Sequence, residues 1–399
     1  MEKVTFKGNC KCLTGKAKFR KCRLCVTGGS GFLGQHLVRE LQRDETVAEI
    51  RVLDLKKYHC RLECDQRVAV CSFVADVRDA EACRRAFRGA GVVFHCAALV
   101  DYSFPPDYDA LHQHNVKGTE TVVRLCVEEG VPRLVLASTA EVCLTPYLGA
   151  GAGLSFSLLV NQTESRAAAP AVGDLPGPEA ERGLIAPGYA ASKLRAERLV
   201  LAADGTPLPS GGVLRTVAVR PTLLYGELDP HLLPPLLRVA RACDGRLPLL
   251  AGAGGRQQVT YVGNAAWALV CAARALASPQ PAVLSAAGLP LFATDDTPPV
   301  DLLRFCARVT ARPDGRLRMR VTSLYLPAPL AYLVAAALED ALSLLQLRAP
   351  VSPRTAVAYL NSVVLFSRLR AALCTKYEPK YSAADALARA NKWYTRDKL

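Results

Sequence analysis

Short apolar runs alternate with longer amphipathic segments along the chain from residue 24 onward. The runs are rich in β-branched residues and have the length of buried strands, whereas the segments between them have helical spacing. The first helix is expected at Gly34–Leu41. Strand, helix and strand in this order indicate parallel βαβ units, so the pattern predicts an α/β fold with a doubly wound parallel sheet. The strands are expected at Leu24–Val26, Ile50–Leu53, Val68–Val74, Val92–His95, Leu134–Ala137 and Val213–Val219.

Two segments depart from this rhythm. Residues 146–188 are dominated by Gly, Ala and Pro, which is typical of a loop or partly disordered insert. The segment 321–347 is apolar apart from Glu339 and Asp340, and its first 18 residues carry no charge. That length is close to the lower limit for a membrane span. A span, a helix lying at a membrane surface and a buried helix of the folded chain all remain open for this segment.

The strongest chemical motif follows the first predicted strand and opens the first helix. Its three glycines have the spacing of a dinucleotide-binding turn. One permits the tight turn, the next lets the backbone approach a pyrophosphate, and the last allows the helix to pack closely on the sheet. The free N–H groups of the helix start then favour the phosphates. The motif predicts a Rossmann-type sheet whose cofactor-binding residues include Gly28, Gly31, Phe32, Leu33 and Gly34.

A carboxylate ends the second predicted strand, because Asp54 lies 20 residues beyond Gly34. An acid at this place accepts hydrogen bonds from the adenosine ribose hydroxyls and repels a 2′-phosphate. The sequence therefore favours NAD over NADP as the cofactor. Lys56 and Lys57 keep NADP as the alternative, since cations beside the ribose attract that phosphate.

Tyr189 and Lys193 are four residues apart at the start of a predicted helix that runs through Leu199. Both side chains lie on one face of that helix. A fixed ammonium beside a phenol favours the phenolate and lowers its pKa. The pair is therefore suited to taking a proton from an alcohol while hydride leaves the same carbon.

Ser138 and Thr139 follow the predicted strand Leu134–Ala137. The carboxyl ends of strands line the ligand crevice of a doubly wound sheet, so a hydroxyl here could hold the oxygen of a substrate. The alternative is that these residues cap a helix or turn, as Ser and Thr often do.

The distribution of charge and of cysteines indicates which partners, compartment and metal sites to expect. Half of the net charge of +14 lies in residues 1–23, and the rest of the chain is mildly basic, so a nucleic-acid groove is not indicated. The 15 cysteines are odd in number and scattered through apolar runs, which indicates free thiols in a reducing compartment. Cys25 lies inside the first strand, and no metal site is predicted from the N-terminal cysteines.

With these motifs the chain resembles the extended short-chain dehydrogenases/reductases, and among them most closely the 3β-hydroxysteroid dehydrogenase/Δ5–Δ4 isomerase family. The resemblance runs from about residue 24 to 395. The segments that carry it are Arg51–Asp54, His95–Ala98, Asn115–Thr119, Arg220–Pro221, Tyr261–Trp267, Asp295–Pro298 and Tyr377–Ser382.

The resemblance implies roles for individual residues. Tyr189 would be the general base, Lys193 would bind the nicotinamide ribose, and Thr139 rather than Ser138 would match the catalytic hydroxyl. It also implies that Asp76 and Pro221 contact the cofactor and that Asp296 is the candidate residue for the isomerase step.

The resemblance further implies location and organisation. Members of the family are associated with endoplasmic reticulum and mitochondrial membranes, and their anchor falls near residues 321–347. We expect a basic extension at 1–23, an NAD-binding Rossmann domain at 24–225 that contains the insert, and a smaller C-terminal substrate-binding region at 226–399. A homodimer is left open.

The expected function is NAD-dependent oxidation of 3β-hydroxy-Δ5-steroids to 3-oxo steroids, followed by isomerisation of the double bond from Δ5 to Δ4, in steroid biosynthesis. The first alternative is another extended short-chain dehydrogenase, either a sterol-decarboxylating enzyme or a sugar-nucleotide epimerase or dehydratase. The second alternative is a non-catalytic binding module that uses the basic extension.

Overall fold

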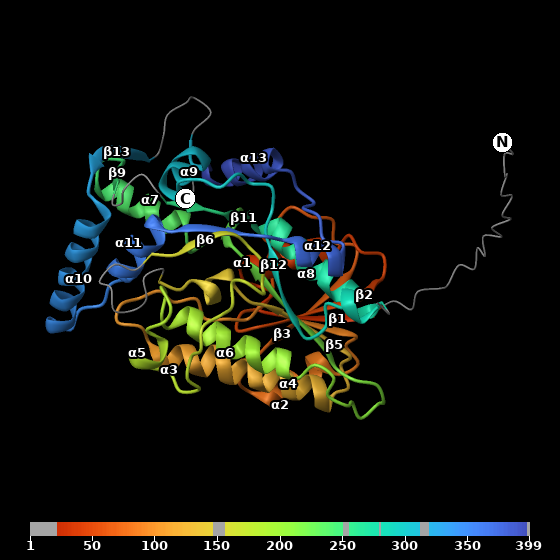
Figure 1. The fold of residues 1–399 in the computed structure, drawn as a ribbon. Helices are drawn as coiled ribbons and strands as arrows, with labels where there is room; N and C mark the ends of the chain where they lie inside the picture. Colours follow the sequence, from red (N-terminus) through yellow and green to blue (C-terminus); the bar gives the residue numbers. More distant parts are fainter. Residues whose placement is uncertain (1–21, 147–155, 250–254, 279–280, 312–318, 397–399) are drawn as a thin grey trace, which may run out of the picture.

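The computed structural model describes residues 22–146, 156–249, 255–278, 281–311 and 319–396, so the predicted extension at 1–23 lies outside it except for its last two residues. A seven-stranded parallel sheet forms the centre of the molecule, in the order β12-β7-β5-β4-β1-β2-β3 (Figure 1). The strands are β1 (Cys22–Thr27), β2 (Val47–Asp54), β3 (Ala69–Val74), β4 (Val92–His95), β5 (Arg133–Ala137), β7 (Arg215–Pro221) and β12 (Leu289–Ala293).

The predicted fold class is confirmed by this sheet, and each of the six expected strands overlaps one of its strands. The strand order reverses beside β1, since β2 and β3 extend the sheet on one side and β4 and β5 on the other. Such a reversal leaves a crevice at the carboxyl ends of β1 and β4, where doubly wound sheets bind their ligands. The crevice is the place where a functional site is expected.

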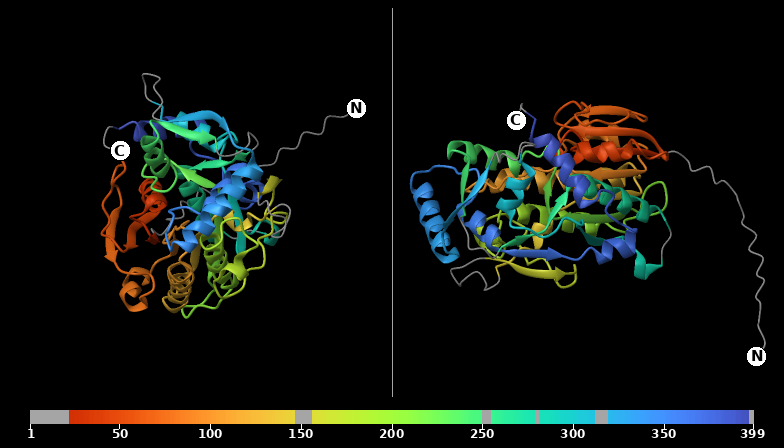
Figure 2. Two further views of the ribbon diagram at one scale, coloured as in Figure 1. Left: turned by 90° about the vertical axis from the view of Figure 1, so that its left-hand side faces the viewer. Right: turned by 90° about the horizontal axis from the view of Figure 1, so that it is seen from above.

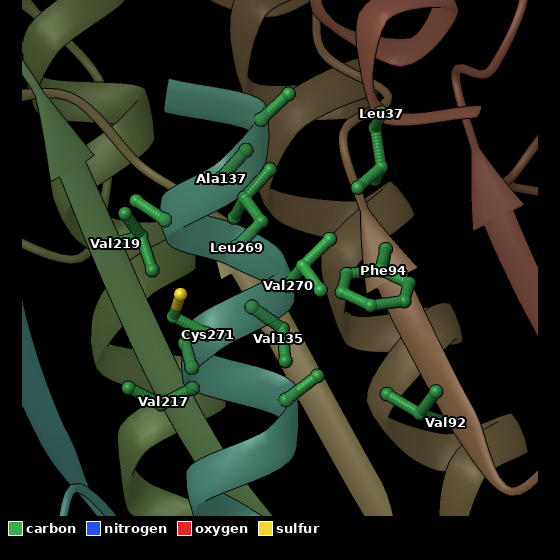
Figure 3. Close-up of a cluster of buried hydrophobic side chains, with 14 of the residues drawn as sticks. Leu37, Val92, Phe94, Val135, Ala137, Val217, Val219, Leu269, Val270 and Cys271 are labelled. Carbon is green, nitrogen blue, oxygen red and sulfur yellow. The ribbon is translucent and has the colours of Figure 1, made fainter. Parts of the chain in front are cut away.

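Helices cover both faces of the sheet because successive strand residues point to opposite sides. In β5, Val135 and Ala137 pack towards α1 (Phe32–Leu41) and α8 (Val262–Ala277), as Figure 3 shows. The intervening residues pack towards the other face, which is covered by α2 (Ala80–Phe87), α4 (Gly118–Glu128) and α6 (Tyr189–Ala202). The sheet is therefore buried on both sides, which explains the continuous apolar runs of its strands.

The segment expected to be a loop insert at 146–188 contains regular structure within its described part. β6 (Leu158–Gln162) pairs with β14 (Val363–Phe366), which also pairs with β10 (Arg256–Gln257). A short helix, α5 (Pro178–Glu181), follows. Residues 147–155 lie outside the described residues. Gly and Ala content alone concealed the strand, because β6 is stabilised by pairing with a segment about 200 residues away in sequence.

The C-terminal part of the chain completes the central sheet and adds a second layer. β12 and α8 lie beyond residue 225, yet they form the edge and one face of the sheet. Eight further elements surround a separate apolar cluster that includes Tyr225, Tyr261 and Phe305. They are β8 (Leu223–Tyr225), α7 (Leu233–Ala242), β9 (Arg246–Leu249), β11 (Val259–Tyr261), α9 (Leu302–Val309), β13 (Arg320–Tyr325), α11 (Pro353–Asn361) and α13 (Ala383–Tyr394). Of the other two helices, α10 (Ala328–Leu344) packs on α11, and α12 (Leu369–Thr375) packs on α8.

The apolar segment at 321–347 forms β13 and α10, and α10 lies at the periphery of the molecule (Figure 2). Its inner face packs on α11, and the buried Glu339 accepts hydrogen bonds from Ser352 and Arg354 there. Its outer face is apolar, and Leu333 is 64% exposed. Within the described part of the chain, no helix has the length and apolar character needed to cross a bilayer.

Candidate active site

A cavity of about 630 Å³ lies at the carboxyl ends of the central strands. The structure brings every predicted site residue except Asp296 to its wall. These residues come from β2, β7, α1, α6 and the turns that follow β1, β3 and β5. They are Gly28, Gly31, Phe32, Leu33, Gly34, Asp54, Asp76, Ser138, Thr139, Tyr189, Lys193 and Pro221.

The glycine-rich turn is closed so tightly that side chains are excluded. Gly28 has φ +70°, and a Cβ there would lie 2.6 Å from the backbone nitrogen of Ala97. A Cβ on Gly34 would lie 2.2 Å from the carbonyl oxygen of Gly28. The start of α1 at Phe32 lies at the cavity wall and has no side-chain cap, so its first N–H groups are available to an anionic ligand.

Two carboxylates stand at the far end of this turn. Asp54 accepts hydrogen bonds from the backbone N–H groups of Ser30, at 2.9 Å, and Lys56, at 3.2 Å. Asp76 forms an ion pair with Arg78 at 2.7 Å, and this pairing lowers the pKa of Asp76. Both acids are therefore fixed in place at the end where the adenosine of a dinucleotide would lie.

The described part of the predicted insert positions the start of α6, the helix that carries Tyr189. Glu181 is fully buried, and its carboxylate accepts hydrogen bonds from the backbone N–H of Gly188 and from Arg195, both at 2.6 Å. Gly188 has φ +82° and directly precedes Tyr189, the first residue of α6. The insert therefore fixes the position of Tyr189, a connection that its Gly- and Ala-rich composition did not reveal.

Asn115 connects the segment after β4 to α6. Its amide donates to the carbonyl of Leu99 at 2.9 Å and accepts from the N–H of the same residue at 2.7 Å. The amide also donates to the hydroxyl of Ser192 on α6. This motif residue of the resemblance therefore ties the segment after β4, which lines the cavity, to the helix that carries Tyr189.

The expected electrostatic coupling between Lys193 and Tyr189 is not found in this structure. The Lys193 ammonium donates to the carbonyl of Ala137 at 2.7 Å, and burial lowers the pKa of Lys193 to about 8. Burial, and after it the nearby Glu141, raise the pKa of Tyr189 above its ordinary value. Since burial and the charge of Glu141 act in the same direction here, the effect of Lys193 on this pKa stays a prediction.

Ser138 and Thr139 have different partners, although they are adjacent. The Ser138 hydroxyl donates to Glu197 at 2.6 Å, and Glu197 forms a buried ion pair with Arg220. The Thr139 hydroxyl accepts from the N–H of Glu141 at 3.2 Å and retains its own proton for donation. Of the two residues, Thr139 is therefore the better candidate for the hydroxyl that holds the substrate oxygen. Ser138 links the ends of β5 and β7 to α6.

Glu141 is a site residue that the sequence interpretation missed. It lines the cavity, is almost fully buried, and accepts hydrogen bonds from Tyr102 at 3.0 Å. The Tyr102 ring in turn packs edge-on against Tyr189, with 5.1 Å between centroids. Burial raises the pKa of Glu141 to about 7. The available signal was an acid two residues after Thr139 within an otherwise apolar run.

Asp296, the predicted isomerase residue, lies away from the cavity wall. Its carboxylate is 59% exposed and pairs with Arg368 at 2.7 Å. The neighbouring Asp295 points inward and accepts hydrogen bonds from the N–H of Tyr261 and the amide of Asn264. The motif around Asp295 is thus a buried structural contact, and Asp296 lies on the surface, outside the wall of this cavity.

Solved structures with the same fold include several sugar-nucleotide enzymes. A UDP-glucose 4-epimerase of Thermus thermophilus in complex with NAD has 22% identity and a TM-score of 0.61, over 94% of this chain and 100% of that one. MoeE5 in complex with UDP-glucuronic acid and NAD has 19% identity and a TM-score of 0.60, over 94% and 100%. The epimerase Mth375 of Methanothermobacter thermautotrophicus has 16% identity and a TM-score of 0.64, over 94% and 93%. The TM-scores show a shared fold, and at these identities they show the fold alone.

The family follows from the sequence itself. Residues 25–150 and 180–326 match the model of the 3-beta hydroxysteroid dehydrogenase/isomerase family. The match covers more than half of the chain and includes the glycine-rich turn, Thr139, Tyr189 and Lys193. The chain therefore belongs to the 3-beta hydroxysteroid dehydrogenase/isomerase family.

Proposed function

We propose that the protein oxidises 3β-hydroxy-Δ5-steroids to 3-oxo steroids with NAD and then moves the double bond from Δ5 to Δ4. The observation that carries the proposal is the meeting of Tyr189, Thr139 and Glu141 at one cavity that also contains a glycine-rich cradle. The first two are the groups that alcohol oxidation requires. The third is a carboxyl group with a pKa of about 7, which is suited to moving a proton within the substrate.

The residues of the cradle fit a dinucleotide. Gly28 and Gly34 leave no space for side chains, the start of α1 would hold the pyrophosphate, and Asp54 would accept hydrogen bonds from the adenosine ribose. NAD, when bound, supplies the hydride acceptor and a positive charge close to the phenol. A positive charge beside Tyr189 opposes the effect of burial and of Glu141 on its pKa.

In the oxidation, Thr139 donates a hydrogen bond to the 3β-oxygen and Tyr189 takes the hydroxyl proton. The electron pair of the C3–H bond leaves as hydride, and the C3–O bond becomes a carbonyl. In the isomerisation, the Glu141 carboxylate takes a proton from C4, and the electrons of that bond form the dienolate. Return of the proton from Glu141 to C6 then gives the conjugated Δ4-3-ketone, so the carboxylate is regenerated.

The charge around the cavity favours an uncharged substrate. Among the described residues of its wall, the Lys and Arg side chains are Lys56 and Arg61 at the adenosine end and Lys193 beside the phenol. The wall also contains apolar residues such as Val100, Leu223 and Leu224. A sugar-nucleotide diphosphate is ordinarily held by further cations, whereas a steroid needs an apolar wall.

The test uses purified protein with pregnenolone and NAD, and follows NADH and the Δ4-3-ketone chromophore separately. We expect both signals to appear, with NADH preceding the chromophore. A parallel reaction with UDP-galactose should show no epimerisation. Activity with UDP-galactose and none with the steroid would replace the proposal by the epimerase alternative.

The isomerisation is expected to depend on pH through Glu141. Its carboxylate form is the base, and its pKa is raised to about 7, so the rate should rise as pH increases through 7 and then level off. The measurement uses a 3-oxo-Δ5-steroid as substrate, so that the oxidation does not contribute. Glu141→Gln should lower this rate about 10²-fold or more and abolish the rise with pH. A Glu141→Gln enzyme with an unchanged pH profile would show that another group moves the proton.

We also propose that the outer face of α10 attaches the protein to an endoplasmic reticulum or mitochondrial membrane. Leu330, Leu333, Val334 and Leu338 form one exposed apolar stripe on this helix. Apolar side chains arranged in this way enter the interfacial region of a bilayer. Because these leucines are exposed, they can be replaced to test the attachment without disturbing the buried face of α10 around Glu339.

Replacing Leu333 and Leu338 together by Asp is expected to reduce co-sedimentation of the protein with phosphatidylcholine vesicles severalfold. The control replaces Leu369 and Leu373, which are similarly exposed on α12, in the same way. The control should sediment like the unaltered protein. Equal losses for the two variants would mean that α10 has no special part in the attachment.

A further inference from the structure

Phenols surround Glu141, the carboxyl group that moves the proton in the proposed isomerisation. They are Tyr102 from the segment after β4, Tyr189 from α6 and Tyr359 from α11, and the charge of Glu141 contributes to the raised pKa of each phenol. Within the described part of the chain, only Tyr102 donates hydrogen bonds to the Glu141 side chain, and its hydroxyl oxygen lies 3.0 Å from each carboxylate oxygen. One phenol therefore holds both oxygens of this carboxylate.

Tyr102 is itself fixed in position by the fold. Its ring packs edge-on against Tyr189, and its carbonyl accepts from the N–H of Ser352 at 2.9 Å. Two residues further on, Phe104 and Ala349 exchange both of their backbone hydrogen bonds, each at 2.9 Å. The connection between α10 and α11 thus holds the backbone of Tyr102, so the direction of its hydroxyl is set by the fold.

We propose that Tyr102 is a positioning residue for the isomerisation, in which its hydroxyl keeps the Glu141 side chain ionised and oriented until this group takes the proton from C4. The proposal rests on the proposed function in that Glu141 is the base. A hydrogen-bond donor stabilises the charged form of a buried carboxyl group. One oxygen of Glu141 receives the C4 proton and returns it to C6, while the other can still accept from Tyr102. Tyr102 keeps its own proton throughout and acts through Glu141.

The first measurement is the isomerisation rate of a 3-oxo-Δ5-steroid as a function of pH, for the unaltered enzyme and for Tyr102→Phe. Loss of the donor favours the protonated form of Glu141, so its pKa should rise above the present value of about 7. At about pH 6 the rate should fall about tenfold, and the pH of half-maximal rate should rise by about one. At about pH 9.5 the two rates should be similar, because Glu141 is then ionised in both enzymes.

Tyr359→Phe is the matched control. It removes a second phenol beside Glu141, but within the described residues this phenol donates no hydrogen bond to the carboxylate and lies outside the cavity wall. The pH profile should therefore stay that of the unaltered enzyme. A shift as large as that of Tyr102→Phe would contradict the proposal, since the hydrogen bond would then not be the cause.

A second readout follows the titration of Glu141 without any steroid. The infrared absorption of its carboxyl group is obtained as the difference between each protein and the same protein carrying Glu141→Gln. Tyr102→Phe should shift this titration to higher pH by about one. An unshifted titration, or a rate deficit of equal size at every pH, would overturn the proposal, because Tyr102 would then only maintain the shape of the cavity. If the unaltered protein does not isomerise the steroid, the proposed function fails, and the titration by itself decides whether Tyr102 keeps Glu141 ionised.

Discussion

Tyr189→Phe is expected to lower steroid-dependent NADH formation by about 10³-fold, since general acid–base groups contribute roughly 10²- to 10⁴-fold to such reactions. The change removes one hydroxyl and keeps the ring that packs edge-on against Tyr102. The cavity should therefore keep its shape, and the affinity for NAD should change little. The rate is measured at saturating pregnenolone and NAD, together with the dissociation constant of NAD.

Tyr108→Phe provides the matched control for this prediction. Tyr108 begins the short helix Tyr108–Leu111 and is not part of the cavity wall, so loss of its hydroxyl should leave the rate near that of the unaltered enzyme. A Tyr189→Phe enzyme that retained more than about a tenth of the original rate would contradict the assignment of the base. The proton would then have to pass to another group of the cavity, with the buried carboxyl group of Glu141 as the candidate.

The parts of the site that could be predicted are those that depend on local sequence. The glycine-rich turn could be predicted from its glycines, because Gly28 and Gly34 occupy positions where a side chain would not fit. Tyr189 and Lys193 are linked by helical spacing, and Asp54 by its place at the end of β2. Parallel strands then bring these local features to one edge of the sheet, so a correct fold class was sufficient to group them.

The parts that escaped prediction depend on contacts between distant segments. The role of Glu181 becomes evident only when Arg195 and Gly188 are seen around its carboxylate. Burial raises the pKa of Glu141, and this burial results from the packing of Tyr102 and of the elements around it. The sequence shows two adjacent acids, Asp295 and Asp296, but not which side chain points into the fold. In the structure it is Asp295. Residue composition and spacing do not show which distant segments come into contact.

The second large effect concerns stability and comes from the buried ion pair of Arg220 and Glu197. Arg220 and Glu197 are about 5% and 2% exposed, and Glu197 also accepts a hydrogen bond from Ser138. Arg220→Met is expected to lower the free energy of unfolding by about 3–5 kcal/mol, because it leaves a carboxylate buried without its partner. Urea denaturation measures the change, and the signal is the shift of the midpoint at constant slope.

Two further variants separate the effect of burial from the loss of a charge. Arg182→Met breaks the exposed pair with Glu179, whose side chains are 72% and 89% exposed, and should cost less than about 1 kcal/mol. The double variant Arg220→Met with Glu197→Leu should recover part of the loss, since no unpaired charge remains in the interior. Recovery should be incomplete, because the Ser138 hydroxyl then lacks its acceptor. Similar losses for Arg220→Met and Arg182→Met would mean that the buried pair does not hold β5, β7 and α6 together, and that Lys193 and Thr139 owe their positions to other contacts.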